Sequence, residues 1–517
     1  MATLDPTQAF YSAAATRAFD QALIQKGHEP GLALMKKAAM QAFATLKKQW
    51  PAPQQLLVVC GSGNNAGDGL FLAQYAYLAG YEGSVTFLMP PQSLKGEARQ
   101  ALDEWLQLGM STAPFDPQHL SEATVVVDAI LGTGLSRPIT EPLASQFAAI
   151  NQSGCPVLAL DLPSGLDADT GTVLGTAIRA DHTVTFITQK LGAVQNQGPD
   201  HVGQHHLGDC HLPEHAWASL ASPPLAYAHG LAHWLSVLPQ SMLNTHKGQR
   251  GTAVLAGGNH AMAGALQLAA SSCLFSGCGL VKLITHTHHH AALSAQQPEW
   301  MLFDPQALTP LSAQAQVLAI GPGLGQDDWA HALMQKALQK ALQIPQPLVI
   351  DADGLNWLAK HPLPEQTSPT GNTRPWILTP HPGEAARLLQ TDTATIQKDR
   401  LAAVKELHQR YGGIIVLKGN GTLIYDGQHC EVCLAGNPGM ATGGMGDVLT
   451  GLIAGLVAQK GPSHQALFEM ACLGVWLHAS AADRLCQQQG VRGVRPSAIA
   501  PLLPAIMAQK HESATHL

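Results

Sequence analysis

The sequence predicts an α/β protein with two domains, each built around a mainly parallel sheet. Short runs rich in Val, Ile and Leu, from LLVVCG at residue 56 to GIIVLKG at residue 413, alternate with longer segments of helical periodicity. This alternation is typical of consecutive βαβ units. A chain of 517 residues is also too long for one hydrophobic core.

The alternation stops between about Gly208 and Lys247, where LPEHAWASLASPPLAYAH contains Pro, Ser and Ala but little strand signal. Such a composition is typical of a linker. We therefore predict a first domain over residues 1–225, in which a helical lead precedes a Rossmann-like three-layer sandwich, and a larger α/β domain over 226–517. In the lead, an apolar helical stripe is predicted to pack against the sheet. Its members are Leu32, Leu34, Met35, Ala38, Ala39, Ala42 and Phe43.

Composition and charge exclude several classes of protein. The chain is 46% hydrophobic and 13% charged and has 50 Gly, which favours compact domains over disorder. Its net charge is −7 without a basic run, so we expect no nucleic-acid partner. Its apolar stretches end before the ~20 residues that a membrane span needs, and MATLDPTQAF lacks the features of a signal peptide. With nine scattered Cys, we expect a cytoplasmic protein without a membrane partner.

Two clusters of metal-ligand residue types have simpler explanations. Cys430 and Cys433 have metal-like spacing, but no second pair stands nearby, and YDGQHCEVCLAG is typical of a hairpin with alternate residues facing inward. The histidines within His286–His290 follow the strand-like LVKLIT, which favours a solvated loop over a ligand cluster. The roles of both clusters stay open.

The segment NPGMATGGMGDVLTG predicts a phosphate-binding turn. Gly443, Gly444 and Gly446 precede DVLTGLIAGLVAQ, whose apolar residues repeat with helical spacing. A glycine-rich turn before a helix leaves backbone N–H groups free to bind phosphate, with the helix dipole behind them. Asp447 stands at the start of this helix. It either caps the helix or acts as a general base on a hydroxyl beside the phosphate.

Three further segments place polar residues or glycines after strands, where α/β sheets bind ligands. GIIVLKGNGT contributes Lys418 and the turn Gly419–Thr422, LAIGPGLG contributes Gly323, and WILTPHPGE contributes His381 between two prolines. Lys and closely spaced glycines suit the phosphates of a nucleotide. A His between prolines cannot lie inside a helix, so we expect it to make a positioned polar contact.

In the first domain, GSGNNAGDG follows a strand but is not a dinucleotide fingerprint, because Asn64 and Asn65 interrupt the glycine spacing. The next strands deliver Asp128 and then Asp161 and Ser164 to the same sheet edge. These oxygen donors favour a hard cation such as an alkali ion over a transition metal. The alternative is that the Asp residues cap helices or brace turns.

The second domain resembles the ribokinase-like fold and, more narrowly, the ADP/ATP-dependent NAD(P)H-hydrate dehydratase family. The motifs GGNHAMAGA, IGPGLG, DADGLN, LTPHPGE, VLKGNGT and GNPGMATGGMGD follow in order and cover nearly all of residues 227–505. The family has Ser or a similar residue where this chain has Asn259. The resemblance implies that the hydrated nicotinamide substrate contacts Ala265, Gly323, His381 and Asp447. It also implies that the adenine nucleotide is held by Lys418, Gly419, Asn420, Gly421, Thr422 and Gly446.

The first domain resembles the NAD(P)H-hydrate epimerase family over about residues 10–215. The motifs are GSGNNAGDG, VDAILGTGLSRP, DLPSGLDADTG and TVTFITQKLG, in this order, and the family has a second Gly where this chain has Ala66. The resemblance implies a set of residues that bind the hydrated cofactor. They are Asn64, Asn65, Ala66, Gly67, Asp68, Gly132, Thr133, Gly134, Leu135, Ser136, Arg137, Pro138 and Asp161.

The resemblance further implies potassium bound by Asn65, Asp128 and Ser164. We expect Asp161 and Lys190 to move protons, since one side chain can accept and the other donate, although Lys190 equally suits a phosphate contact.

Together the two resemblances imply repair of hydrated NADH and NADPH. The first domain would interconvert the R and S hydrates, and the second would dehydrate the S hydrate at the expense of ADP or ATP, with Mg²⁺ on the nucleotide. We also expect a homo-oligomer. The alternative is a small-molecule kinase, for a vitamin precursor or a sugar, whose first domain is a non-catalytic binding module.

Overall fold

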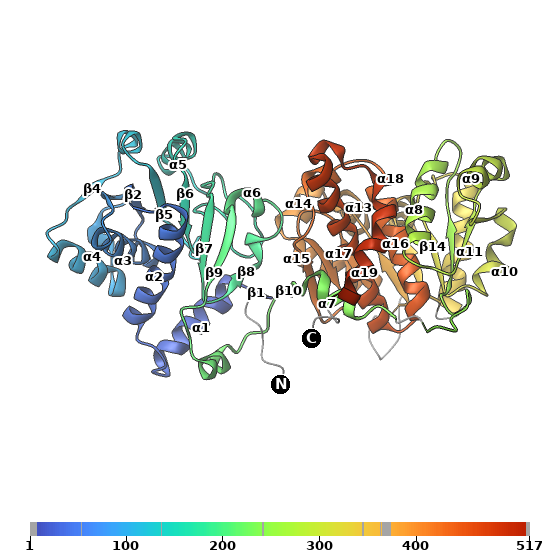
Figure 1. Cartoon of the computed structure of the whole chain (residues 1–517), viewed down its shortest axis with the longest axis horizontal. Coiled ribbons are helices and arrows are strands. Elements are labelled where there is room, and N and C mark those ends of the chain that lie inside the picture. The colour runs from blue at the N-terminus through green and yellow to red at the C-terminus, as the bar shows by residue number, and fades with distance from the viewer. Residues whose placement is uncertain are drawn as a thin grey trace. The chain divides into compact units, whose positions relative to one another are not determined.

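The structure is a computed structural model that describes residues 8–512 apart from 53, 136, 240, 241, 344, 345, 362 and 364–373. Ser136, expected to bind substrate, lies outside the described residues. The chain forms two compact units, Met1–Tyr227 and Ala228–Leu517, and we describe each by itself (Figure 1). Strands and helices alternate along both units, which confirms the predicted α/β class.

The first unit is built on a sheet with the strand order β4-β3-β2-β5-β6-β7-β9, in which every neighbouring pair is parallel. The order reverses between β2 and β5. In open parallel sheets such a reversal opens a crevice at the carboxyl ends of the strands. The strands are β2 (Gln55–Cys60), β3 (Glu82–Phe87), β4 (Thr112–Pro114), β5 (Val125–Ala129), β6 (Val157–Leu160), β7 (His182–Phe186) and β9 (Gln204–Gly208).

Helices cover both faces of this sheet. Val58 of β2 belongs to the apolar cluster under α2, α3 and α4, whereas its neighbour Val59 packs with Phe147 of α5 on the opposite face. This alternation is the period of two expected of a strand buried on both sides. The helices are α1 (Ala13–Gln25), α2 (Gly31–Gln49), α3 (Asn64–Leu78), α4 (Gly96–Gln107), α5 (Leu143–Gln152) and α6 (Pro199–Val202).

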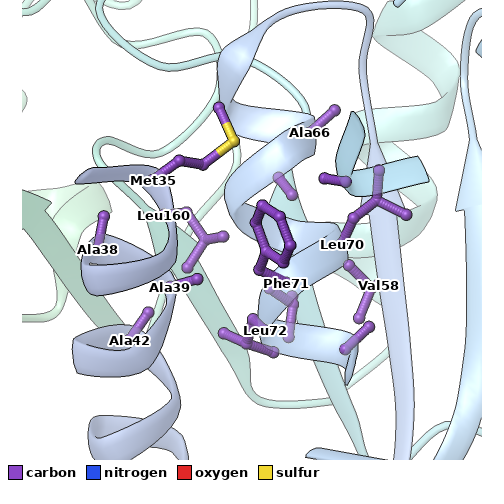
Figure 2. Close-up of a cluster of buried hydrophobic side chains, with 14 of the residues drawn as sticks. Met35, Ala38, Ala39, Ala42, Val58, Ala66, Leu70, Phe71, Leu72 and Leu160 are labelled. Atoms are coloured by element: carbon purple, nitrogen blue, oxygen red, sulfur yellow. The ribbon is translucent and has the colours of Figure 1, made fainter. Parts of the chain in front are cut away.

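The apolar stripe of the helical lead packs as predicted. Figure 2 shows Met35, Ala38 and Ala39 of α2 facing the cluster that contains Phe71 of α3 and Leu160 of β6. Small residues on α2 let the helix lie close to α3, and burial of this apolar surface is what stabilises the pair.

The first unit also contains three short strands, β1, β8 and β10. β1 (Ala9–Tyr11) pairs antiparallel with β10 (Ala226–Tyr227) and parallel with β8 (Gln189–Lys190). Because Tyr11 is the register partner of Lys190, the beginning of the chain fixes the backbone that carries this lysine.

The sheet of the second unit runs β13-β12-β11-β14-β15-β16-β17-β18-β19. It is parallel as far as β17 and ends in the antiparallel strands β18 and β19. Its strands are β11 (Thr252–Ala256), β12 (Leu280–Ile284), β13 (Met301–Phe303), β14 (Val317–Ile320), β15 (Leu348–Ile350), β16 (Trp376–Leu378), β17 (Ile414–Leu417), β18 (Thr422–Tyr425) and β19 (Cys430–Cys433).

Helix α16 lies against α8 and α17. A Cβ added at Gly451 would lie 1.8 Å from the carbonyl oxygen of Ala269, and one at Gly455 would lie 2.1 Å from Oγ of Ser276. These glycines therefore allow α16 and α8 to touch backbone to backbone. The helices are α7 (Gly230–Ser236), α8 (Ala263–Phe275), α9 (His290–Gln296), α10 (Leu308–Ser312), α11 (Asp328–Gln343), α12 (Ala352–Lys360), α13 (Pro382–Leu389), α14 (Thr393–Lys398), α15 (Arg400–Tyr411), α16 (Met445–Lys460), α17 (His464–Gln489), α18 (Pro496–Ile499) and α19 (Leu503–Glu512).

Two local predictions are wrong in part. β18 and β19 form the predicted hairpin, but all four residues of β19 are buried, because α17 packs on this strand and buried Trp side chains satisfy Glu431. The histidine run is not a solvated loop. A 3-10 turn, η5 (Thr287–His289), leads directly into α9, and the rings of His286 and His289 are half-buried.

Candidate active sites

The carboxyl ends of β2, β5 and β6 carry the polar residues that the sequence singled out in the first unit. Asn64 and Asn65 begin α3, the helix that follows β2. Asp128 is the penultimate residue of β5. Asp161 follows β6 in a left-handed conformation with φ 65°. A non-glycine residue in this region marks a backbone position that the surroundings impose.

Asp161 and Lys190 form a buried ion pair. Lys190 Nζ lies 2.6 Å from Asp161 Oδ1, and the lysine side chain is only 1% exposed. Its ammonium also donates to Thr185 Oγ1 at 2.8 Å and to the carbonyl of Phe186 at 2.9 Å. With three acceptors in a buried site, the lysine is held as a cation whose charge Asp161 balances.

The loop after β5 closes over Asp161. Thr133 N donates to Asp161 Oδ2 at 3.1 Å, and a Cβ at Gly132 would lie 2.8 Å from the same oxygen. Only glycine lets the loop come this close. Beyond it Gly134, Arg137 and Pro138 are exposed and Leu135 is half-buried, so the loop presents an accessible surface next to the ion pair.

Asp128 and Ser164 contact each other directly. Ser164 Oγ donates to Asp128 Oδ1 at 2.6 Å, and Ser164 N donates to Oδ2 at 2.8 Å. Burial raises the pKa of Asp128 to about 6. Asn65 is also buried, and neither polar atom of its amide has a hydrogen-bond partner in the structure. Buried amides are rarely left unpaired, so Asn65 offers its oxygen to a ligand.

The start of α3 explains two residues of the GSGNNAGDG motif. The methyl group of Ala66 points into the apolar cluster (Figure 2), so the family's glycine at this position is replaced without obstructing a ligand. A Cβ at Gly67 would lie 2.5 Å from Sδ of Met35 and 2.9 Å from Cα of Ala98. Gly67 is therefore required for packing between helices.

Sequence reasoning missed three residues around this site. Asp20 of α1 has a buried, unpartnered Oδ1, and burial raises its pKa to about 6. His205 of β9 has an unpartnered Nε2, and burial lowers its pKa to about 4. Arg17 of α1 donates to the carbonyl of Thr133 at 2.7 Å. None lies in a glycine-rich or strand-end motif, so only the fold brings them to the Asp161 side of the sheet.

In the second unit, Asp447 lies in the first turn of α16, not at its N-cap. The N-cap position is Gly444, in the left-handed region at φ 99°. No described residue donates a hydrogen bond to the Asp447 carboxylate. Burial, followed by the negative charge of Asp351, raises its pKa to about 7. The capping interpretation is therefore wrong, and the side chain is free to exchange a proton near neutral pH.

Lys418 is held by acidic partners next to the glycine turn. Its Nζ lies 2.7 Å from Asp351 Oδ1 and 3.7 Å from Glu384 Oε2. Asp351 also accepts from Thr450 Oγ1 of α16 at 2.6 Å. Burial opposes ionisation of Asp351, but the charge of Lys418 outweighs it and lowers the pKa of that carboxyl. A Cβ at Gly446 would lie 3.1 Å from Lys418 Nζ, so a side chain at this position would make the lysine shift slightly.

A buried arginine, Arg400, holds the backbone of the turn Gly419–Thr422. Arg400 donates to the carbonyls of Leu417 and Gly421, both at 3.2 Å. Gly419 has φ 142°, and a Cβ there would lie 2.7 Å from the guanidinium. Thr422 Oγ1 donates to the Gly419 carbonyl at 3.0 Å, which closes the turn, while Asn420 at its tip is exposed. No sequence pattern indicated Arg400, which is the first residue of α15.

His381 is the N-cap of α13. Its Nδ1 accepts from Gly383 N at 3.0 Å and from Glu384 N at 3.3 Å, and its own backbone N–H donates to Glu384 Oε2 at 2.7 Å. Burial and the nearby Lys418 lower the pKa of this imidazole. Because Nδ1 accepts both bonds, a proton on this ring sits on Nε2, which lies 3.3 Å from Glu384 Oε1 in a side chain that is 50% exposed.

Ala265 and Gly323 lie together on the other side of the site. A Cβ at Gly323 would lie 3.1 Å from the Ala265 methyl group. Asp353 connects this pair to Asp447, since its Oδ2 accepts from Gly325 N at 2.9 Å and its charge acts on the Asp447 carboxyl. Asp353 and Lys418 both act on the Asp447 carboxyl, so residues from the Gly323–Gly325 turn and from the Lys418 turn lie near it.

Two family models match the chain. The NAD(P)H-hydrate dehydratase family matches residues 253–505, and the YjeF-related protein N-terminus matches residues 31–192. The bifunctional NAD(P)H-hydrate repair enzyme of Coxiella burnetii is 41% identical over 92% of this chain and 94% of its own length. The chain belongs to the bifunctional NAD(P)H-hydrate repair enzyme family. The enzyme of that name from Vibrio cholerae is also 41% identical, over 92% of this chain and 93% of its own length.

Among solved structures, an ADP/ATP-dependent NAD(P)H-hydrate dehydratase from Bacillus subtilis, co-crystallised with ATP/Mg²⁺, is 29% identical. It aligns with a TM-score of 0.48 over 55% of this chain and 98% of its own. The repair-enzyme family accounts for both predicted halves of the fold, a Rossmann-like sandwich followed by a ribokinase-like domain.

The extent of the N-terminal family match bears on the three residues that sequence reasoning missed. Arg17, Asp20 and His205 lie outside residues 31–192, the stretch that the N-terminal family model covers. Among the described helices, none combines the length and the apolar character that a bilayer crossing requires.

Proposed function

We propose that this chain repairs hydrated NADH and NADPH in two steps. Residues 1–225 form an epimerase domain that interconverts the R and S hydrates. Residues 226–517 form a dehydratase domain that converts the S hydrate at the expense of ADP, giving AMP, phosphate and NADH or NADPH. The observation that carries this proposal is the unpaired Asp447 carboxyl, with a pKa of about 7, beside a lysine and a glycine turn at a helix start.

In the dehydratase step, Asp447 removes the proton from the substrate hydroxyl as the β-phosphoryl group of ADP is transferred to that oxygen. The glycine turn and the start of α16 stabilise charge on the transferring group. Phosphate then leaves with the former hydroxyl oxygen, the adjacent ring carbon loses a proton to solvent, and the electron pair of that C–H bond restores the ring double bond. Ala265, Gly323 and His381 hold the hydrated ring, and the nucleotide binds to Lys418, Gly419, Asn420, Gly421, Thr422 and Gly446.

A magnesium ion accompanies the nucleotide. The described residues include no group of three His, Cys, Asp or Glu side chains arranged to hold a metal. Mg²⁺ commonly takes its ligands from substrate phosphates, waters and one or two carboxylates, and such a site needs no protein cage. Asp351, beside Gly446, would supply such a carboxylate.

In the epimerase step, Asp161 and Lys190 act as the proton-moving pair. The hydrated cofactor binds between the start of α3, at Asn64–Asp68, and the loop Gly132–Pro138. Potassium binds to Asn65, Asp128 and Ser164, and the unpartnered Asn65 amide and the buried Asp128 carboxyl support an oxygen-ligated cation there. Activity of the full chain on the R hydrate should fall in potassium-free buffer, and indifference to potassium would remove this part of the proposal.

One assay tests the two activities together. Purified protein is incubated with mixed R and S hydrates and ADP, and the return of reduced-nicotinamide absorbance is followed. Full recovery supports both activities. Fast recovery of the S fraction alone, followed by recovery of the R fraction only at the rate of spontaneous epimerisation, would contradict the epimerase assignment.

Asp447→Asn tests the catalytic assignment. We expect recovery to fall by at least about a hundredfold, because general-base catalysis contributes roughly 10²–10⁴ to a rate, while ADP binding measured by calorimetry is retained. Normal turnover in this variant would show that Asp447 is not the base.

The competing function is a small-molecule kinase. It would use the same Asp447 but release a stable phosphorylated product. Detection of such a product by mass spectrometry, with no return of reduced nicotinamide, would favour the kinase. We also propose that the protein is a homo-oligomer, which sedimentation of the full chain tests directly.

A further inference from the structure

Four aromatic rings stack beside the substrate side of the second unit. The ring centroid of His286 lies 4.4 Å from that of Trp329 on one face and 4.3 Å from that of His260 on the other. His288 lies beside both of these imidazoles, 5.0 Å from His260 with an interplanar angle of 7° and 5.3 Å from His286. We call Trp329, His286, His260 and His288 the histidine stack.

Asn259 ties the histidine stack to the predicted substrate site. This buried amide accepts from His286 Nε2 at 3.0 Å, and its Nδ2 donates to the Asp327 carboxylate at 3.0 Å. The backbone N–H of Asn259 donates to the carbonyl of Gly323 at 2.7 Å. Because Gly323 touches Ala265, the stack is fixed next to both substrate-side residues.

Neither a metal site nor core packing explains the stack. The described residues contain no His, Cys, Asp or Glu cluster with metal-binding geometry. His260 and His288 are exposed, so the histidine stack faces solvent and is not part of the hydrophobic core. Trp329 Nε1 and His289 Nε2 are buried without partners, which is unusual for groups that donate hydrogen bonds.

The histidine stack offers two kinds of chemistry for recognising a ligand. Flat rings can extend onto the face of a purine base, and imidazole N–H groups donate to phosphate oxygens and gain charge below about pH 6.5. A nicotinamide dinucleotide has both features at the end remote from its reacting ring. If the ring sits at Ala265, Gly323 and Asp447, the rest of the molecule must leave the site along one of its flanks.

We infer that the histidine stack binds the phosphate-bearing adenosine half of the hydrated dinucleotide in the dehydratase site. This inference rests on the proposed function and adds a subsite to it. Hydrogen bonds and charge from His260 and His288 hold the phosphates, and the outer ring faces support the adenine.

The test compares a dinucleotide with a truncated substrate. The double variant His260→Ala/His288→Ala of the full chain is assayed with ADP on the S hydrate of NADH, on that of NADPH and on the hydrate of reduced nicotinamide mononucleotide. We expect KM for both dinucleotide hydrates to rise about tenfold, kcat to change less than twofold, and KM for the mononucleotide hydrate and for ADP to stay the same.

His246→Ala serves as the matched control, since His246 is an exposed histidine of the same unit that makes no contact with the stack. An unchanged dinucleotide KM in the double variant, or an equal rise for the mononucleotide hydrate, would overturn the inference. Wild-type protein that dehydrates none of the three substrates would instead contradict the proposed function. A variant that unfolds is replaced by His260→Gln/His288→Gln, which keeps the side-chain volume and removes the charge.

Discussion

At the scale of single residues, the chemistry of the second unit depends on the proton affinity of Asp447. Burial and the carboxylates of Asp351, Asp353 and Glu384 favour its neutral form, while Lys418 opposes them, and the pKa settles at about 7. At neutral pH about half of the molecules carry such a base in its ionised form, and this form accepts a proton readily.

The dehydratase rate should therefore follow the ionisation of Asp447. Because the base acts as the carboxylate, kcat is lost as the pH falls through about 7 and reaches a plateau above it. A pH–rate profile on pure S hydrate with saturating ADP measures this limb. A flat profile between pH 5.5 and 8 would contradict the assignment.

The same residue should lower stability. A carboxyl whose folded pKa is raised binds its proton more tightly in the folded state, so stability falls as pH rises from about 4 to about 7. Asp447→Asn removes this cost. We expect the Tm of the variant to exceed that of the wild type, and by more at pH 8 than at pH 5, in calorimetric scans. An equal or lower Tm at pH 8 would show that the carboxylate is better solvated than its contacts indicate.

At the scale of elements, the end of the second sheet is fixed by Glu431 of β19. This 1% exposed carboxylate accepts from Trp234 Nε1 at 2.8 Å, from Trp476 Nε1 at 3.0 Å and from His229 Nδ1 at 2.8 Å. It thereby joins α7 and α17 to the edge of the sheet. This network also gives the CEVC segment a structural role in place of metal binding.

Glu431→Ala should destabilise the second unit strongly. The change leaves two indole N–H groups and an imidazole without their acceptor in a buried site, at a cost of about 3–5 kcal/mol. Chemical unfolding monitored by tryptophan fluorescence measures the loss. Glu431→Gln, which keeps one acceptor oxygen, is the matched control and should lose less. Equal stability of the alanine variant and the wild type would mean that water replaces the carboxylate.

How far the sequence could predict these elements depended on the kind of signal. Strand–helix alternation and the glycine turns were visible as local patterns, and Lys418, Asp161 and Asp128 stand where those patterns placed them. Arg400 and Asp20 lie in helices without a predicted motif, whereas Thr450 lies within NPGMATGGMGDVLTG but was not assigned a role, because its bond to Asp351 joins segments far apart in the chain. Local periodicity carries no information about such pairings. For the same reason the histidine run was assigned to a loop, since Trp329 and His260 could not be placed beside it.

At the scale of the whole molecule, two activities on one chain make each unit a control for the other. Asp161→Asn should abolish epimerisation and leave dehydration of the S hydrate unchanged. Asn tolerates the left-handed backbone of this position, and Lys190 keeps its acceptors Thr185 and Phe186. The site therefore loses its charge without losing its shape.

The measurement is the absorbance recovered from a mixture of R and S hydrates. With Asp161→Asn, the fast phase should end at the S fraction, and the remainder should follow spontaneous epimerisation. Full fast recovery would show that Asp161 is not required. Loss of the S phase as well would show that the substitution disturbs the entire chain.

The backbone contact between α16 and α8 has a consequence for how this domain can change over evolution. With Gly451 pressed against Ala269, there is no side-chain layer between the helix that carries Asp447 and the helix that carries Ala265. In the proposed site, the separation of the proposed base from the proposed substrate contact therefore depends on the approach of two main chains, which any side chain at Gly451 would disturb. New substrate preferences must arise instead in the surrounding loops, where single substitutions alter the pocket while the helix pair remains constant.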